Sequence, residues 1–116
     1  MTAPDARGLR PLGRQAAEMA RLLRILAHAD RLRLLCRLAA AEGAGFAEPT
    51  VGELAALIGR SQSRVSQHLA QLRAAGVVAP RRQGQTVRYR LLDRRVRRVM
   101  DALSVLCEAG APGRRG

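Results

Sequence analysis

The apolar residues near the start of the chain recur at intervals of three and four, which is the repeat of a helix with one buried face. In a first predicted helix, from about Leu12 to Ala27, these positions are Ala16, Met19, Ala20, Leu23 and Leu26. A second helix is predicted from about Asp30 to Ala41, with Gly43 as its stop. Its inward residues are Leu34, Leu35, Leu38 and Ala39. The pattern therefore predicts two consecutive helices with a very short connection.

Two shorter helices follow the loop "EGAGFAEP", residues 42–49. The stretch "TVGE" is typical of a capping box, in which Thr50 accepts from the first-turn amides and Glu53 reaches back, and it predicts a helix over Thr50–Ile58. The stretch "SQSRVSQHLAQLRAAG" predicts the next helix, capped by Ser61 and stopped by Gly76. Its buried residues are expected to be Val65, Leu69 and Leu72. Two such helices joined by "GRS" form a helix-turn-helix.

A hairpin and a last helix complete the pattern. In "VVAPRRQGQTVRYRLL" a β-prone run, a turn at Gly84 and a second alternating run predict two antiparallel strands. One face of the second run carries Val87, Tyr89 and Leu91, and the other carries Arg88 and Arg90. The last helix is predicted from about Asp93 to Glu108. Its apolar stripe is Val96, Val99, Met100, Leu103 and either Leu106 or Cys107.

These elements predict a mainly α-helical fold with a small β-hairpin, in the order four helices, two strands and a fifth helix. A helix-turn-helix followed by an arginine-tipped hairpin is the arrangement of a winged helix. With 116 residues the chain is expected to form one domain. We expect a flexible arm over residues 1–10, a DNA-binding and dimerisation domain over residues 11–109, and a flexible basic tail over residues 110–116.

The net charge of the chain limits the class of molecule that it is expected to bind. There are 21 basic residues, all arginine, against nine acidic ones, which gives a formal net charge of +12 and should attract a polyanion. With one Tyr, one Phe and no Trp, base stacking on single strands is improbable, so duplex DNA is favoured. The sequence has no apolar run of about 18 residues and no signal-like start. We therefore expect a soluble cytoplasmic protein with no membrane partner.

The second helix of the helix-turn-helix is the predicted reader of DNA. Its outer face carries short polar side chains that can bond base edges: Gln62, Ser63, Ser66 and Gln67. Arg64 could reach a guanine or a phosphate, and His68 could position a phosphate or pack against a neighbouring helix. Phosphate or minor-groove contacts are expected from the wing residues Arg81, Arg82, Gln85 and Arg88. The alternative for the polar face is an ordinary solvated helix surface.

The run "SQSRVSQHLAQLRAAGVV" followed by "RRQGQTVRYRL" resembles the ArsR/SmtB family of bacterial repressors. The resemblance implies a winged-helix homodimer that pairs through its first and last helices, binds an imperfect inverted repeat and leaves DNA when an inducer binds. Metal-sensing members carry cysteines in the first helix of the helix-turn-helix or histidines in the last helix. Here "TVGELAALIG" has no cysteine and "DRRVRRVMDALSVLCEAG" has no histidine. We therefore expect no metal and no cofactor.

The chain has two cysteines, Cys36 and Cys107. Their placement resembles the dithiol subgroup of the family, the BigR and SqrR type, which implies sensing of persulfide or sulfide through a disulfide or polysulfide crosslink. Because Arg33 and Arg37 flank Cys36 and favour its thiolate, we expect Cys36 to attack first and Cys107 to resolve.

Other hypotheses for the two cysteines remain open. They are two buried apolar fillers, a general peroxide-responsive redox switch, and a repressor responsive to arsenite or another thiophilic metal. An architectural DNA binder without a sensor is a further alternative. An enzyme acting on small thiols is not expected, because no base pairs with either cysteine.

Overall fold

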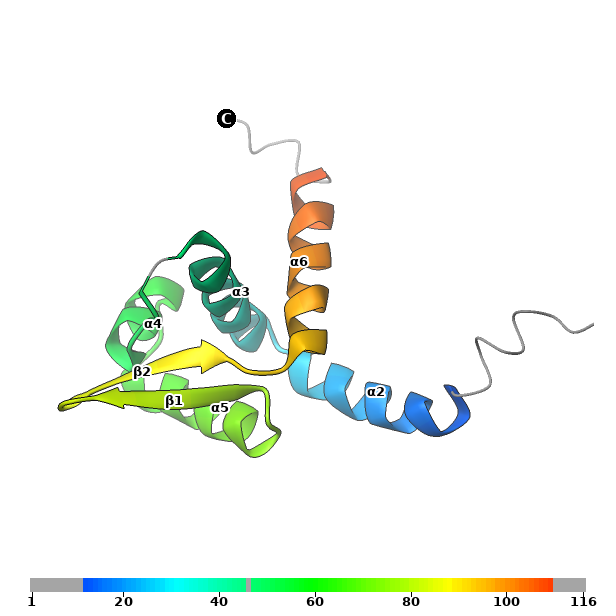
Figure 1. Cartoon of the computed structure of the whole chain (residues 1–116), viewed down its shortest axis with the longest axis horizontal. Helices are drawn as coiled ribbons and strands as arrows, with labels where there is room; N and C mark the ends of the chain where they lie inside the picture. The colour runs from blue at the N-terminus through cyan, green and yellow to red at the C-terminus, as the bar shows by residue number, and fades with distance from the viewer. Residues whose placement is uncertain (1–11, 46, 110–116) are drawn as a thin grey trace, which may run out of the picture.

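The computed structural model describes residues 12–45 and 47–109, with the side chains of residues 12, 13, 44 and 106–109 left out. The predicted flexible arm and basic tail lie outside this range. The described chain contains five helices and a two-stranded antiparallel hairpin, as predicted for a winged helix-turn-helix (Figure 1). Among these residues no helix is both long and apolar enough to cross a membrane.

The first two helices are α2, Leu12–Leu26, and α3, Ala29–Ala44. The prediction that Gly43 stops the second helix is wrong: the helix runs through it and ends at Gly45. The φ angle of Gly45 is +75°, and its N–H points to the carbonyls of Ala41 and Glu42. This helix stops where the chain takes the left-handed conformation, which Gly45 adopts and Gly43 does not.

The helix-turn-helix consists of α4, Val51–Ile58, and α5, Gln62–Ala74. The predicted capping box is present, since Thr50 Oγ1 accepts from the Glu53 N–H at 3.1 Å and Glu53 Oε1 accepts from the Thr50 N–H at 3.0 Å. Ser61 caps α5 by accepting from the Arg64 N–H. The predicted inward residues of α5 are all at most 1% exposed: Val65, Leu69 and Leu72.

The wing consists of β1, Val78–Gln83, and β2, Thr86–Leu91, joined by a tight turn in which Gly84 has a φ of +63°. The loop before α4, whose role the sequence did not reveal, runs along the outer edge of β2. The Tyr89 N–H donates to the Pro49 carbonyl at 2.9 Å, and Thr50 forms a bridge with Arg88. The loop therefore braces the wing.

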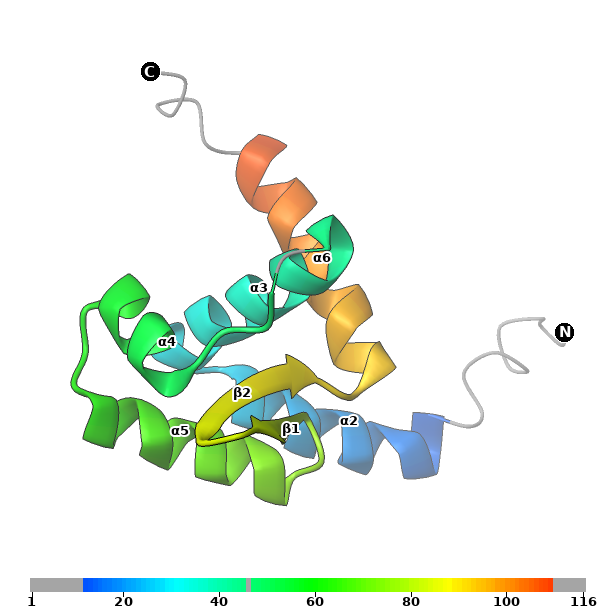
Figure 2. The ribbon, with the colours of Figure 1, turned by 60° about the vertical axis from the view of Figure 1, so that its left-hand side comes forward.

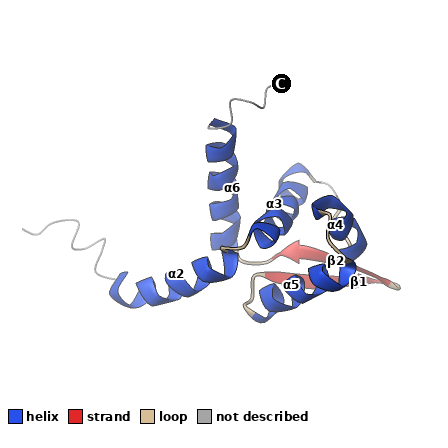
Figure 3. Cartoon of the chain, turned by 180° about the vertical axis from the view of Figure 1, so that it is seen from behind, coloured by secondary structure: helices blue, strands red, loops and turns tan. Residues whose placement is uncertain are grey.

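The last helix is α6, Arg94–Ala109, and its inner residues Val96 and Met100 are buried in the core. Helix α3 is central, because it packs against α4, β2 and α6. The start of α2 and the end of α6 extend beyond the body formed by α3, the helix-turn-helix and the wing (Figures 1, 2 and 3). Leu23 on α2 and Val105 on α6 are 55% and 65% exposed.

Candidate nucleic-acid interface and thiol site

The outer face of α5 carries the predicted base-reading residues. Their side chains are all exposed and lie in the first two turns of the helix: Gln62, Ser63, Ser66 and Gln67. Arg64 is exposed beside them. The opposite face of α5 is buried, so the fold presents this one polar strip outward. The strip has the donors and acceptors that base edges in a major groove require.

His68 does not share that outer face. It is 8% exposed, and its Nδ1 accepts from Arg31 Nε at 3.2 Å across the contact between α5 and α3. Burial lowers the pKa of His68, as do the electrostatic interactions of its ring with His28 and with the charge of Arg31, so the ring is neutral near pH 7. The prediction that His68 contacts DNA does not fit this placement. Its other predicted role, in helix packing, does.

The predicted wing residues fall into two groups. Arg81 forms an ion pair with Glu48 at 3.1 Å, and Arg88 donates to the Glu48 carbonyl at 2.7 Å while lying 3.7 Å from a carboxylate oxygen of Glu53. These two side chains hold the bracing loop against the sheet. Arg82 and Gln85, at the tip of the wing, are exposed. Arg81 is exposed as well, with 52% of its side chain accessible, so Arg88 is the one of these four wing residues that is turned toward the loop.

Cys36 lies on α3 and faces α6. Its Sγ is 4.0 Å from Met100 Sδ, and its side chain lines a cavity of about 180 Å³ together with Arg97 and Ser104 of α6. Cys107 falls within the bounds of α6, but its side chain lies outside the described part of the chain. Position 107 follows Met100 by seven residues and Ser104 by three, so it belongs to the same face of the helix.

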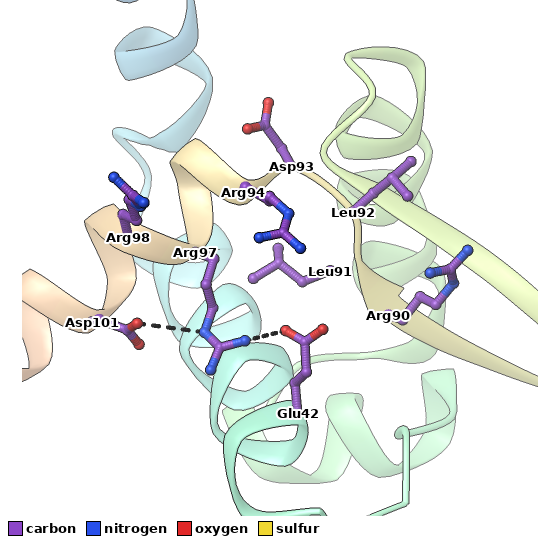
Figure 4. Close-up of a pocket in the computed structure, with 9 residues that line it drawn as sticks. All are labelled: Glu42, Arg90, Leu91, Leu92, Asp93, Arg94, Arg97, Arg98 and Asp101. Carbon is purple, nitrogen blue, oxygen red and sulfur yellow. Dashed lines mark hydrogen bonds and ion pairs between the residues drawn. The ribbon is translucent and has the colours of Figure 1, made fainter.

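A larger, arginine-rich pocket adjoins the Cys36 cavity, between the end of α3, the end of β2 and the start of α6 (Figure 4). Its volume is about 440 Å³. Arg97 is shared by both cavities and bridges Glu42 on α3 and Asp101 on α6. The contact with Glu42 fastens the first turns of α6 to the end of α3, the helix that carries Cys36, and the contact with Asp101 lies within α6.

Asp30, at the start of α3, is the most buried charged residue described, at 3% exposed. Its two carboxylate oxygens accept from Arg33 at 3.0 Å and from Arg60 at 2.9 Å. Burial alone raises the pKa of Asp30, but the hydrogen bond and charge of Arg60, with the charge of Arg33, outweigh it and hold the pKa below its usual value. The carboxylate is therefore ionised, and both of its oxygens accept hydrogen bonds from arginine.

His28, Asp30 and His68 form a cluster that sequence reasoning missed. Their possible ligand atoms lie within 4.8 Å of one another, and two imidazoles with a carboxylate suit zinc and similar metals. However, the Nδ1 atoms of His28 and His68 both accept hydrogen bonds, from the Asp30 N–H and from Arg31. A neutral imidazole that accepts at Nδ1 carries its proton on Nε2, which then has no lone pair for a metal. The contacts present favour a hydrogen-bonded network.

A helix-turn-helix with an exposed polar recognition face and an arginine-tipped wing defines a winged-helix DNA-binding protein. Residues 28–79 match the family model described as bacterial regulatory protein, arsR family. The biofilm growth-associated repressor of Agrobacterium fabrum is 40% identical over 95 residues, which cover 81% of this chain and 76% of that protein.

Two solved structures agree with this match. The reduced form of HlyU from Vibrio cholerae is 37% identical with a TM-score of 0.74, covering 84% of this chain and 97% of that one. The transcriptional repressor BigR from Xylella fastidiosa is 35% identical with a TM-score of 0.73, covering 84% and 93%. The chain belongs to the arsR family and is a DNA-binding transcriptional regulator.

Proposed function

We propose that the chain is a homodimeric repressor that senses reactive sulfur species, persulfide or sulfide, through Cys36 and Cys107. A disulfide or polysulfide between the two thiols then releases the protein from its operator. The observation that carries this proposal is the position of Cys36: it faces the stripe of α6 that contains Met100 and Ser104 and continues to position 107. The likeness to BigR and to the reduced form of HlyU supports it.

The dimer is supported by the apolar side chains on the two projecting helices. Leu23 on α2 and Val105 on α6 are more than half exposed, and a second copy of the chain would cover them. A twofold pair places two copies of α5 about one helical turn of DNA apart, which matches an imperfect inverted repeat. In that complex the outer face of α5 reads bases, while Arg64, Arg82 and Gln85 contact phosphates or the minor groove.

With a persulfide as the inducer, formation of the crosslink needs no further oxidant, whereas sulfide must first be oxidised to a persulfide or polysulfide. The Cys36 thiolate attacks the terminal sulfur of a low-molecular-weight persulfide, takes that sulfur to become a persulfide, and releases the carrier as a thiol. Cys107 then attacks the inner sulfur of Cys36, which forms the disulfide and releases hydrogen sulfide. If Cys107 is also persulfidated, attack of one persulfide on the other gives a trisulfide and the same leaving group. A trisulfide spans a wider gap than a disulfide, whose α-carbons lie about 4.4–6.8 Å apart.

Intact mass spectrometry tests the sensing chemistry directly. Reduced protein is treated separately with glutathione persulfide, hydrogen peroxide and arsenite, with Cys36→Ser and Cys107→Ser as matched controls. After persulfide treatment the proposal expects a crosslink only in the unsubstituted protein: a disulfide, with loss of two hydrogens, or a trisulfide, with one sulfur added. Loss of two hydrogens with peroxide as readily as with persulfide would make it a general redox switch, and a stable arsenic adduct would make it a metalloid sensor. An unmodified protein after all three would contradict thiol sensing.

A further inference from the structure

We propose that Arg31 is a positioning residue for DNA recognition: it fixes the recognition helix relative to α2 and so sets which half-site spacing the dimer accepts. The inference goes beyond the sensing function and does not depend on either cysteine. It rests on DNA binding and on the proposed dimer. The carrying observation is that one guanidinium joins three helices.

Arg31 lies in the first turn of α3 and is half-buried. Its Nη1 donates to the Ile25 carbonyl at 2.9 Å, in the last turn of α2. Its Nε donates to His68 Nδ1 at 3.2 Å, and its Nη2 donates to Gln71 Oε1, both on α5. The side chain of this α3 residue therefore ties the end of α2 to the recognition helix α5.

A second contact that positions the recognition helix comes from Asp30, the residue before Arg31. The buried carboxylate of Asp30 accepts from Arg60, which lies in the turn between α4 and α5. The His68 ring is also held by the edge of the His28 ring, with their centroids 4.6 Å apart. Helix α5 is thus held at two places: just before its start, through Arg60, and along its length, through His68 and Gln71. The residues that hold it lie in the first turn of α3 or at the cap of that helix.

The geometry of arginine makes this contact directional. A guanidinium is a rigid planar fork, so three donors fixed at once define an orientation, whereas a lysine ammonium offers one point charge on a flexible stem. In a dimer, each recognition helix must meet its own major groove, about 34–36 Å from the other. A small tilt of α5 against α2 is repeated in both subunits. Loosening Arg31 should therefore broaden the range of accepted spacings more than it changes contacts at each half-site.

Competitive binding to a spacing library tests this inference. A half-site is first selected from random duplexes with the unmodified protein, and then placed as an inverted repeat at every spacing within about one helical turn. The ratio of affinity at the best spacing to that at neighbouring spacings is measured for Arg31→Lys and His68→Gln. Because a charge-assisted hydrogen bond is lost without loss of charge, we expect Arg31→Lys to reduce that ratio by roughly tenfold. His68→Gln is expected to reduce it less.

Arg73→Lys is the matched control, since Arg73 is exposed in the last turn of the same recognition helix. It should keep the spacing ratio of the unmodified protein. All variants are checked by circular dichroism and thermal melting, and if Arg31→Lys does not fold, Gln71→Ala removes one of its bonds in its place. A folded Arg31→Lys or Gln71→Ala protein with the unmodified spacing ratio would overturn the inference. A uniform loss of affinity at all spacings would also overturn it, because that result indicates a structural role only.

Discussion

The two faces of the recognition helix differ in what their side chains are bonded to. The outer face carries exposed polar residues such as Gln62 and Ser66 in its first two turns. The inner face packs Val65 and Leu69 into the core and adds His68, which is bonded to α3. The difference is what we expect if the proposed reading of bases and the placement of the helix are carried by separate residues. Substitutions on the two faces should therefore change different measurable quantities.

The largest effect is expected on the inner face. Leu69 is 1% exposed, and Leu69→Ala should lower the free energy of unfolding by about 2–5 kcal/mol because it leaves a cavity in the core. Urea denaturation measures this change. Leu57→Ala is the matched control, because Leu57 is 56% exposed and its truncation should cost no more than about 0.5 kcal/mol. Equal losses for the two variants would show that the inner face is not the packed one.

An outer-face substitution should spare stability and change sequence preference. Gln62→Ala removes a side chain suited to a bidentate contact with adenine, so discrimination at one base pair should fall by about 1–3 kcal/mol. Competition between duplexes that differ at single positions measures it, with urea denaturation alongside. A loss of affinity that is the same for every sequence would assign Gln62 to the backbone of DNA instead.

The wing allows a finer test, because its arginines differ in their partners. Arg82 is exposed at the tip, and Arg82→Ala should weaken binding to all sequences and reduce the salt dependence by about one phosphate contact. Arg88 is bonded to Glu48, so Arg88→Ala should chiefly lower the melting temperature. The plot of log affinity against log salt separates the two. The same change in slope for both would mean that Arg88 leaves Glu48 to contact DNA.

The smallest expected effect is a pH dependence of stability. Burial lowers the pKa of His68, as do the electrostatic interactions of its ring with His28 and with the charge of Arg31, so the folded state resists a proton that the unfolded chain accepts near its ordinary pKa of about 6.5. Stability from the neutral ring is present above that pH and is lost as the pH falls below it. Urea denaturation between pH 8 and pH 5.5 should show a smaller decline for His68→Gln. Parallel curves would mean that His68 does not titrate differently on folding.

The sequence was sufficient to predict what depends on local pattern. The helix caps at Thr50 and Ser61, the inward residues of α5 and the hairpin turn at Gly84 all follow from residue type and spacing. Contacts between distant segments could not be predicted in this way. His68 has the polar character of a DNA contact, and only the packing of α5 on α3, 37 residues earlier at Arg31, shows it turned inward.

The same limit applies to the wing and to the thiol region. Arginines at alternating positions of a hairpin suggest a basic surface, but Arg81 pairs with the carboxylate of Glu48, and Arg88 donates to the main-chain carbonyl of the same residue. Nor does any local pattern reveal that Cys36 contacts Met100, 64 residues away. Such pairings depend on how the elements assemble in three dimensions.

The two faces of α5 also suggest how the proposed thiol signal would reach DNA. Helix α3 carries Cys36, which faces α6, and Arg31, which holds α5. A covalent link between α3 and α6 that shifts α3 would therefore also shift the Arg31 contacts that hold α5. The side chains on the outer face of α5 would stay chemically unchanged. The expected result is loss of the dimer geometry that matches the operator.

Fluorescence anisotropy of a labelled duplex, selected by the reduced protein, tests this claim most directly. Adding glutathione persulfide to the bound complex should release the duplex, and dithiothreitol should restore binding. Cys36→Ser and Cys107→Ser should each stay bound throughout, with unchanged affinity before treatment. The account is contradicted if either serine variant releases the duplex as readily as the unsubstituted protein. It is equally contradicted if the unsubstituted protein, shown by mass to be crosslinked, keeps its hold on DNA.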